Sequence, residues 1–473
     1  MRTEKDFLGE ANVADEVYYG VQTLRAVQNF PITGEKLNRD LILALAVIKR
    51  SAALANMSTG RLEEPLGEAI VAATDEILSG KLHDQFVVDP IQGGAGTSIN
   101  MNANEVIANR ALELLGANKG EYSILSPNNH VNMAQSTNDV IPTAIRITSI
   151  WKVKQLLTSL SLLRKRFQEK AVAFESVLKM GRTHLQDAVP ITLGQEFLAY
   201  AQVLGRAIHR IQAAETRLHT VNLGATAVGT GLNAEPAYIE RVVAEVSAVT
   251  GERFYSADNL VDATQNTDEL ADLSGALKVT ALAMSKIAND LRLMASGPRC
   301  GLNELHLPAR QPGSSIMPGK VNPVIPEVLN QTCFQVIGND HVISLAVEAG
   351  QFELNVMEPV LAYNLFQSIT ILGNAVRVFS EHCVKDIAAN LPRCAELVNG
   401  SVGIVTALLP HLGYEKASFV AKEALSTGKS VKMIVLDHKL LKEAELNAIL
   451  APAEMTRPGI AGEQFIRRFM QAI

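Results

Sequence analysis

Four short polar segments hold most of the side chains that could bind or transform a small polar molecule. They are GGAGTS (93–98), QSTND (135–139), GRTHLQD (181–187) and GSSIMPGKVNP (313–323). Each supplies hydroxyl or amide groups with one or two charged or titratable groups, without a pair of carboxylates or a metal-ligating cluster. The candidate residues are Thr97, Ser136, Thr137, Asn138, Thr183, His184, Ser314, Ser315, Lys320 and Asn322.

This set of side chains suits a small dicarboxylate. Hydroxyl and amide groups can donate to carboxylate oxygens, and Lys320 adds positive charge, so no metal is required. Runs of Ser, Thr, Asn and Asp also favour helix caps and turns, and a single histidine such as His184 is more often structural than catalytic. The hypothesis therefore depends on the four segments acting together, which composition alone does not show.

The lysine-containing segment looks at first like a phosphate-binding loop, but its spacing is wrong. Gly313 and Gly319 enclose five residues instead of four, and Val321 follows Lys320 where a hydroxyl residue is needed. Pro318 also lacks an amide donor. We interpret the segment as a loop for a different anion.

The composition argues against several classes of protein. A net charge of -6 and a pI of about 6.0 give no electrostatic footprint for nucleic acid. Four cysteines without CxxC spacing disfavour zinc and a disulfide framework. MRTEKDFLGE lacks an apolar signal core, and Lys49-Arg50 interrupts the apolar run that begins at Leu41, which disfavours a membrane span. We expect a cytoplasmic enzyme.

Long helices must position the four segments. From 143 to 179 there is no Gly or Pro and apolar residues recur at helical spacing, and similar stretches follow at 191–221, 264–296, 324–348 and 352–389. Helices of this length predict a side-by-side bundle, and apolar ridges on more than one face of 264–296 predict packing against other subunits. We expect an N-terminal domain (1–137), a central bundle (138–392) and a small helical C-terminal domain (393–473) with turns at LLPHLGY and PGIAG.

GSSIMPGKVNP resembles the signature loop of the fumarase/aspartase superfamily, whose members eliminate a small group from a succinyl skeleton to give fumarate. The resemblance extends through GGAGTSINMNANE, QSTNDVIPTA, GRTHLQDAVPITLGQEF and GQFELNVMEPV. It implies a mostly α, three-domain subunit with a long central helical bundle, assembled as a homotetramer. GGAGTSINMNANE replaces the GSGTQ and NMNVNE of fumarases, and with VDATQNTD (261–268) it favours the aspartase branch, with class II fumarase as the alternative.

The resemblance also implies a role for each candidate. Thr97 and the run from Ser136 to Asn138 would come from one subunit, Thr183 and His184 from a second, and the 313–322 loop from a third. Ser314 would be the base, and Thr97, Ser136, Thr137 and Ser315 would stabilise the charge that develops. Lys320 and Asn322 would hold the α-carboxylate, and Asn138 and His184 would contact the amino group, with Glu327 orienting His184.

The implied reaction is the reversible deamination of L-aspartate to fumarate and ammonia through a doubly charged aci-carboxylate, with no cofactor or metal. The alternative within the family is the interconversion of malate and fumarate. A structural protein that kept the lyase fold would be free to lose site residues, yet all four segments are intact. Lyases acting on argininosuccinate or adenylosuccinate would need room for a larger substituent, and the close match to the aspartase branch disfavours them.

Overall fold

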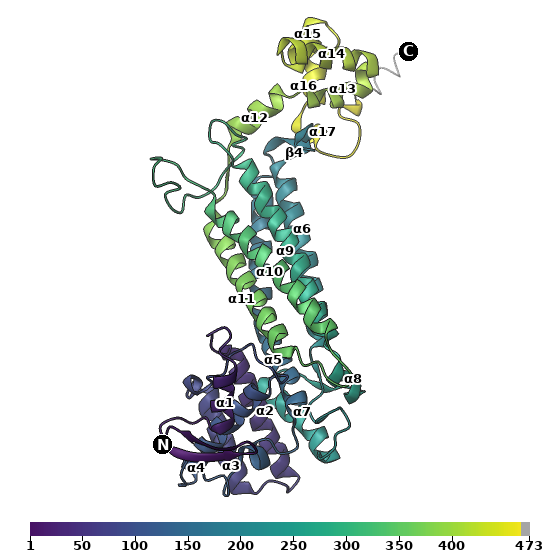
Figure 1. Cartoon of the computed structure of the whole chain (residues 1–473). Coiled ribbons are helices and arrows are strands. Elements are labelled where there is room, and N and C mark those ends of the chain that lie inside the picture. The colour runs from purple at the N-terminus through teal and green to yellow at the C-terminus, as the bar shows by residue number, and fades with distance from the viewer. Residues whose placement is uncertain (465–473) are drawn as a thin grey trace. The chain divides into compact units, whose positions relative to one another are not determined.

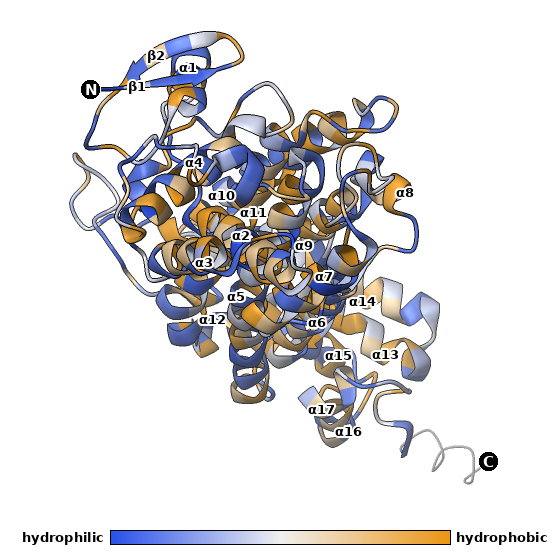
Figure 2. Cartoon of the chain, turned by 90° about the horizontal axis from the view of Figure 1, so that it is seen from below, coloured by the Kyte–Doolittle hydropathy of each residue, from blue (hydrophilic) through white to orange (hydrophobic). Residues whose placement is uncertain are grey.

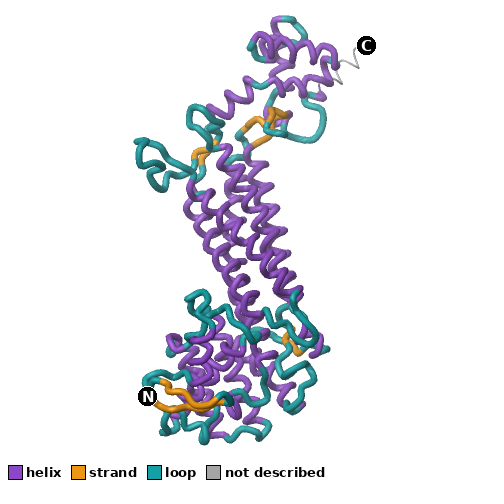
Figure 3. The backbone as a smooth tube through the Cα atoms, in the orientation of Figure 1, coloured by secondary structure: helices purple, strands orange, loops and turns teal. Residues whose placement is uncertain are grey.

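The computed structural model describes residues 1–464, and most of them are helical (Figures 1 and 3). The chain forms two compact units. The first comprises Met1–Thr158, Ala207–Leu282 and Thr332–Asn374, and the second comprises Ser159–Arg206, Ala283–Gln331 and the chain from Ala375 onward. These units are assembled from alternating stretches of sequence, so they do not test the predicted division into 1–137, 138–392 and 393–473, which stays a prediction.

Five long helices contribute residues to both units, and they confirm the predicted long-helix architecture. They are α5 (Thr137–Ala173), α6 (Leu193–Arg217), α9 (Asp268–Met294), α10 (Val324–Glu348) and α11 (Glu358–His382). The range of α10 is as predicted, whereas the other four helices differ from their predicted ranges at one or both ends. Helix α5 ends six residues before 179 because strand β3 begins at Leu178, and α11 begins at Glu358 because residues 351–357 form turns.

Helix α5 also begins earlier than predicted, since it continues through Pro142. Proline has no amide hydrogen, so Pro142 cannot donate to the carbonyl oxygen of Asn138 one turn earlier. The side-chain amide of Asn222 donates to this oxygen at 3.0 Å instead. The polar partner allows the helix to start at Thr137, directly after a predicted site residue.

In the first unit, short elements surround segments of the long helices. The hydroxyl of Ser274 on α9 donates to Asp340 on α10 at 2.8 Å, and Asn339 on α10 donates to Ser368 on α11 at 3.0 Å. The short elements are β1 (Arg2–Asp6), β2 (Gly9–Val13), α1 (Val21–Asn29), α2 (Arg39–Ser58), α3 (Glu64–Leu78), α4 (Thr97–Leu114), β5 (Thr220–Val221), α7 (Pro236–Thr250), β6 (Tyr255–Ser256) and α8 (Leu260–Gln265).

Helix α2 is a core helix of the first unit. By length and composition it could cross a membrane, but 72% of its most apolar window is buried inside the protein. Figure 2 shows the ribbon of β1 largely in blue and much of α2 in orange and tan, in keeping with this difference in burial. One buried residue of α2 is a lysine, Lys49, to which we return below.

In the second unit, an aromatic cluster joins the long helices. The ring of Phe167 on α5 lies 5.9 Å from that of Phe197 on α6 and 6.3 Å from that of Phe379 on α11. The other elements are β3 (Leu178–Thr183), β4 (Gln186–Thr192), β7 (Leu305–His306), β8 (Ala388–Ala389), α12 (Leu391–Gly400), α13 (Val405–Leu412), α14 (Tyr414–Thr427), α15 (Val431–Asp437), α16 (Glu443–Ile449) and α17 (Pro452–Met455).

The C-terminal helices share an apolar core that includes Leu408, Val420 and Ile434. The turn predicted within LLPHLGY (408–414) lies near the end of that segment. Most of LLPHLGY belongs to α13, which includes Pro410, and the chain turns at Gly413, whose φ is +76°. The left-handed conformation at Gly413 ends the helix, whereas Pro410 near its end does not.

Helix α9 carries apolar residues on more than one face, as predicted. Large apolar residues of this helix are buried within the chain, among them Leu273, Leu277, Met284, Ile287, Leu291 and Met294. Val279, Leu282 and Leu293 on the same helix are exposed, Leu282 to 52%. The helix therefore has apolar surface beyond what its own chain covers.

Candidate active site

Three of the predicted residues line one open pocket in the first unit. Thr97 is the first residue of α4, Ser136 directly precedes α5, and Thr137 begins α5. The N-terminal ends of helices carry unpaired amides and partial positive charge, which favours an anion near them. The other polar lining residues are Gln22, Asn100, Asn128, Asn132, Gln135, Thr226 and Asn233. Because this lining contains no carboxylate, it suits a negatively charged ligand.

Ser136 caps α5, as the interpretation of QSTND as a helix cap predicts. Its Oγ accepts from the backbone amide of Asn138 at 3.2 Å, and its own amide donates to Oδ1 of Asp139 at 2.9 Å. The second oxygen of Asp139 accepts from the amides of Gly224 and Thr226, both at 3.0 Å. Burial raises the pKa of Asp139 to about 6. Asp139 thus joins the start of α5 to another wall of the pocket.

Asn138 is held beside the pocket, not among its lining residues. Its side-chain amide donates to the carbonyl oxygen of Ala227 at 2.7 Å. Ala227 itself lines the pocket. In this arrangement Asn138 fixes the 226–227 segment, and its predicted contact with an amino group stays a prediction.

Beneath this pocket lies a charged residue that we did not assign to the site from the sequence. Lys49 of α2 is fully buried, and its ammonium donates to the side-chain oxygens of Asn100 at 2.7 Å, Asn132 at 2.9 Å and Gln135 at 2.8 Å. Burial lowers the pKa of Lys49 to about 7, against the attraction of Asp139. The signal in the sequence was a lysine at the centre of an apolar helix, which we took only as a break in a hydrophobic run.

Thr183 and His184 lie at the tip of a β-hairpin in the second unit. Thr183 pairs with Gln186, so the turn contains only His184 and Leu185, with φ values of +54° and +61°. Two-residue turns of this hand favour Asn and Gly, because other residues are strained in the left-handed region. All three residues at the tip are exposed. His184 and Leu185 therefore hold a strained backbone conformation at the tip of the hairpin.

Charged side chains on both strands of this hairpin are anchored to other parts of the second unit. Arg182, next to Thr183, donates to both carboxylate oxygens of Glu304 at 3.0 and 2.9 Å, and Glu304 is fully buried. Lys179 on the same strand donates to Glu196 at 2.8 Å. On the following strand, Asp187 accepts from the hydroxyl of Ser401 at 2.7 Å. The exposed tip is therefore carried by two firmly held strands.

The loop that contains Ser314 directs amide donors at the serine oxygen. The backbone amides of Ile316 and Met317 donate to Ser314 Oγ at 3.2 and 3.0 Å. Large apolar side chains are exposed along the loop, with Ile316 83% and Met317 47% accessible. An exposed apolar loop that carries a reactive candidate is suited to closing over a ligand.

The base of this loop is closed by hydrogen bonds. The amide of Gly313 donates to the carbonyl of Lys320 at 2.7 Å, and the side-chain amide of Asn322 donates to the carbonyl of Gly313 at 2.8 Å. A Cβ on Gly313 would lie 2.8 Å from Lys320 O and from Asn322 N, so a larger residue would open the clamp. Lys320 and Asn322 line an open pocket that Arg292 also lines. In this conformation Asn322 supports the loop.

The ten predicted residues thus fall into separate groups. Thr97, Ser136, Thr137 and Asn138 belong to the first unit, whereas Thr183, His184 and the 313–322 loop belong to the second. Among the ion pairs of residues 1–464, none joins Glu327 to His184 within one chain. Over the same residues, no three His, Cys, Asp or Glu side chains are placed to hold a metal ion. The predicted roles of the ten residues remain predictions.

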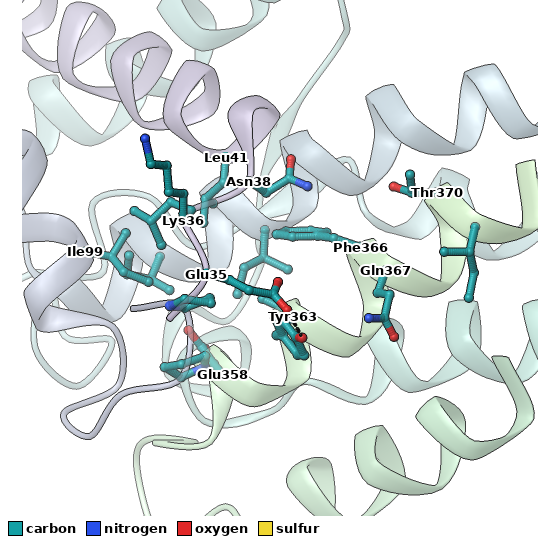
Figure 4. Close-up of a pocket in the computed structure, with 17 residues that line it drawn as sticks. Glu35, Lys36, Asn38, Leu41, Ile99, Glu358, Tyr363, Phe366, Gln367 and Thr370 are labelled. Atoms are coloured by element: carbon teal, nitrogen blue, oxygen red, sulfur yellow. Dashed lines mark hydrogen bonds between the residues drawn. The ribbon is translucent and has the colours of Figure 1, made fainter. Parts of the chain in front are cut away.

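A third cavity, shown in Figure 4, contains none of these ten residues. It lies in the first unit, and apolar side chains such as Leu41, Ile99 and Phe366 contribute much of its lining, with a volume of about 210 Å³. The hydroxyl of Tyr363 donates to Glu35 at 3.0 Å among the lining residues. Unlike the pocket around Ser136, this cavity has carboxylates in its lining, those of Glu35 and Glu358.

Comparisons with known proteins agree on one class of enzyme. A family model described as "Lyase" matches residues 9–338, and a model described as "Fumarase C C-terminus" matches residues 404–457. The chain is 61% identical to the aspartate ammonia-lyase of Bacillus subtilis over 99% of this chain and 98% of that protein.

Two solved structures share the fold. A fumarate lyase:delta crystallin from Brucella melitensis, bound to cobalt, has a TM-score of 0.94 and 49% identity, over 97% of this chain and all of that one. A class II fumarase from Schistosoma mansoni has a TM-score of 0.93 and 37% identity, over 97% and 99% of the two chains. The fold and the sequence together define a lyase. The chain belongs to the fumarase/aspartase family.

Proposed function

We propose that this protein is an aspartate ammonia-lyase, which converts L-aspartate reversibly to fumarate and ammonia. The observation that carries the proposal is the 61% identity, over nearly the full length of both chains, to a protein of that name. The pocket around Ser136 supports it, because its hydroxyl and amide donors suit a dicarboxylate and its lining has no acidic side chain.

The chemistry begins with removal of a proton from C3 of the substrate by Ser314. The C3 proton lies next to a carboxylate that is already negative, so its loss gives a doubly charged aci-carboxylate. Hydrogen-bond donors held in place where this charge develops stabilise the transition state, and this is usually the largest contribution to catalysis. Thr97, Ser136, Thr137 and Ser315 fill this role, and the two amides that donate to Ser314 Oγ favour its deprotonated form.

The remaining residues bind the substrate and assist the departure of ammonia. Lys320 and Asn322 hold the α-carboxylate, Asn138 and Thr183 contact the substrate, and His184 contacts the amino group, oriented by Glu327. Closure of the 313–322 loop brings Ser314 to C3 and excludes water. The reaction needs no organic cofactor, since the proton acceptor and the anion donors are all side chains and backbone amides.

The active form is a homotetramer in which each site takes residues from three subunits. The exposed apolar residues of the long helices support this assembly, because Leu282 on α9, Phe334 on α10 and Leu345 on α10 are 52%, 61% and 55% accessible in the single chain. Such side chains are usually covered in the functional protein when they recur along a helix. The four cysteines are all free thiols, which supports a cytoplasmic location.

A malate-to-fumarate activity is the second candidate, favoured by the 37% identity and the TM-score of 0.93 to a class II fumarase. The test follows fumarate by its ultraviolet absorbance with L-aspartate and with L-malate in parallel, without added cofactor. We expect fumarate from L-aspartate and at most slow turnover of L-malate. Efficient dehydration of malate with no activity on aspartate would reverse the assignment.

A further inference from the structure

Lys49 presents three hydrogen-bond donors to three carboxamide oxygens in a fully buried position. The acceptors are the side chains of Asn100, Asn132 and Gln135, at 2.7, 2.9 and 2.8 Å from the ammonium nitrogen. All three carboxamide residues line the pocket that contains Ser136 and Thr137, whereas Lys49 itself does not. The lysine therefore acts on the pocket through the amides.

The ammonium group determines which way each carboxamide faces. An ammonium has donors and no acceptor, so the oxygen of each carboxamide must face Lys49 and its NH₂ group must face away. For Asn100, this orientation directs Nδ2 to Oδ1 of Asn132 at 3.1 Å and to Oγ1 of Thr137 at 3.5 Å. Asn132 Oδ1 also accepts from Asn104 at 3.1 Å, which fixes the same orientation from another side.

The orientation of Asn100 in turn sets the role of the Thr137 hydroxyl. When Asn100 Nδ2 donates to Thr137 Oγ1, the hydroxyl oxygen of Thr137 accepts this hydrogen bond. The hydroxyl hydrogen is then free to donate to a ligand in the pocket. If Asn100 were reversed, its oxygen would accept the hydroxyl hydrogen and remove this donor from a bound anion.

We propose that Lys49 is a positioning residue, which acts through Asn100 to keep the hydroxyl of Thr137 oriented as a hydrogen-bond donor toward a bound dicarboxylate. The proposal deepens the proposed function, since it rests on the pocket being the dicarboxylate site. Asp139 is the acidic group whose charge attracts Lys49. Its carboxylate accepts hydrogen bonds from the amides of Ser136, Gly224 and Thr226, so the lysine donates to the three carboxamides instead.

The experiment is a double-mutant cycle read by binding, so that it does not depend on turnover. Succinate, a dicarboxylate that cannot undergo the elimination, is titrated calorimetrically into the full-length protein. Thr137→Val and Lys49→Met are each expected to weaken succinate binding by about tenfold, the usual effect of losing one hydrogen bond to a charged group. The double variant is expected to bind no more weakly than Thr137→Val alone, because the lysine acts through that hydroxyl.

A second pair of variants guards against misfolding of Lys49→Met, which leaves a buried gap. Asn100→Ala keeps the lysine with two of its acceptors and removes the link to Thr137. It should therefore weaken succinate binding as much as Lys49→Met does. Combined with Thr137→Val, it should cause no further weakening. Circular dichroism and size-exclusion chromatography establish that each variant is folded and assembled. The matched control is Arg50→Met, because Arg50 is the half-buried neighbour of Lys49 on α2, donates to Asp75 and does not line the pocket; this variant should bind succinate as the parent does.

The outcomes separate the two proposals. If the losses of succinate affinity multiply in either double variant, Lys49 acts by its charge or by general support of the fold. That result would overturn the positioning role. If the parent protein turns over L-aspartate but the losses of affinity for succinate multiply, the proposed function stands and only this inference is wrong. A parent that neither binds succinate nor forms fumarate would remove both.

Discussion

The backbone amide of Met317 donates a hydrogen bond to the side-chain oxygen of Ser314 at 3.0 Å. The amide of Ile316 donates to the same oxygen at 3.2 Å. A hydroxyl that receives two amide donors is easier to deprotonate, because the donors stabilise the alkoxide more than the neutral alcohol. This arrangement is also a common turn in serine-containing loops, so its catalytic meaning has to be measured.

Ser314→Ala should lower kcat for the deamination of L-aspartate by about a thousandfold, within the range expected for loss of a general base. The serine is in an exposed loop and its removal leaves no cavity, so the circular dichroism spectrum and the size-exclusion profile should be unchanged. Ser426→Ala, in the exposed last turns of α14, is the control and should keep full activity. Near-normal turnover in Ser314→Ala would show that another group takes the proton.

Lys320→Ala should raise KM for L-aspartate as well as lower kcat. The lysine is assigned to a carboxylate that is charged in the substrate and in the transition state alike, so its removal weakens both. Steady-state kinetics of the two loop variants, measured side by side, give the comparison. A kcat effect of Lys320→Ala with no change in KM would contradict its assignment to ground-state binding.

Mixed assembly tests whether the site is shared between chains. We expect the variants Ser136→Ala and Ser314→Ala each to be inactive. In the experiment, the two proteins are mixed, denatured together and refolded. If the two serines of one site come from different chains, roughly one site in four should recover in tetramers of random composition. Separately refolded parents must remain inactive. Mixed tetramers verified by mass spectrometry that show no regained activity would rule out this division of the site.

Glu358 predicts a dependence of stability on pH. The carboxyl is 1% exposed, and burial raises its pKa to about 8, against the opposing effect of Arg146. Between about pH 4.5 and 8 the unfolded chain has lost a proton that the folded chain keeps, so the free energy of unfolding falls as pH rises, by at most about 1.4 kcal/mol per pH unit.

Glu358→Gln lacks this proton and should become more stable relative to the parent as pH rises from 5 to 8. The measurement is the difference in Tm between the two proteins at several pH values, with the exposed Glu68→Gln of α3 as the control. A difference that does not change with pH would mean that Glu358 is ionised in the folded protein.

The sequence predicted the long helices well because apolar periodicity over many residues outweighs single exceptions. It failed at the boundaries where one polar contact decides. Pro142 does not exclude the first turns of α5, because Asn222 satisfies the carbonyl that the proline leaves free. The turn predicted in LLPHLGY is present at its glycine, Gly413, and Pro410 lies inside α13.

The site was predicted from residue types that are common at helix caps, and the structure shows that one of these residues is a cap and also lines a pocket. Ser136 caps α5 and lines the pocket. Lys49 was missed for a different reason. A lysine in an apolar helix has no local partner in the sequence, and its three acceptors come from positions 51, 83 and 86 residues away. Only the tertiary fold brings them together.

Leu185→Gly should stabilise the hairpin that carries His184. Leu185 has a φ of +61° and is 71% exposed, so glycine removes left-handed strain at little cost in apolar burial. The gain should be about 1 kcal/mol. Leu425→Gly is the matched control, since this leucine is 77% exposed within α14, where glycine lowers helix stability. Opposite shifts in Tm are expected, and a loss in both would show that the side chain of Leu185 is covered in the assembled protein.

With the proposed role of His184, the same two-residue turn sets stability and function against each other under directed evolution. Libraries screened for heat resistance alone would be drawn toward the Asn-Gly pair that the turn geometry prefers, and so would discard the imidazole in the first position. Libraries screened for turnover would keep His184 and could replace only Leu185 with a residue that relieves the backbone strain. The pair at 184 and 185 is thus a place where the choice of screen, more than the starting sequence, decides which enzyme is recovered.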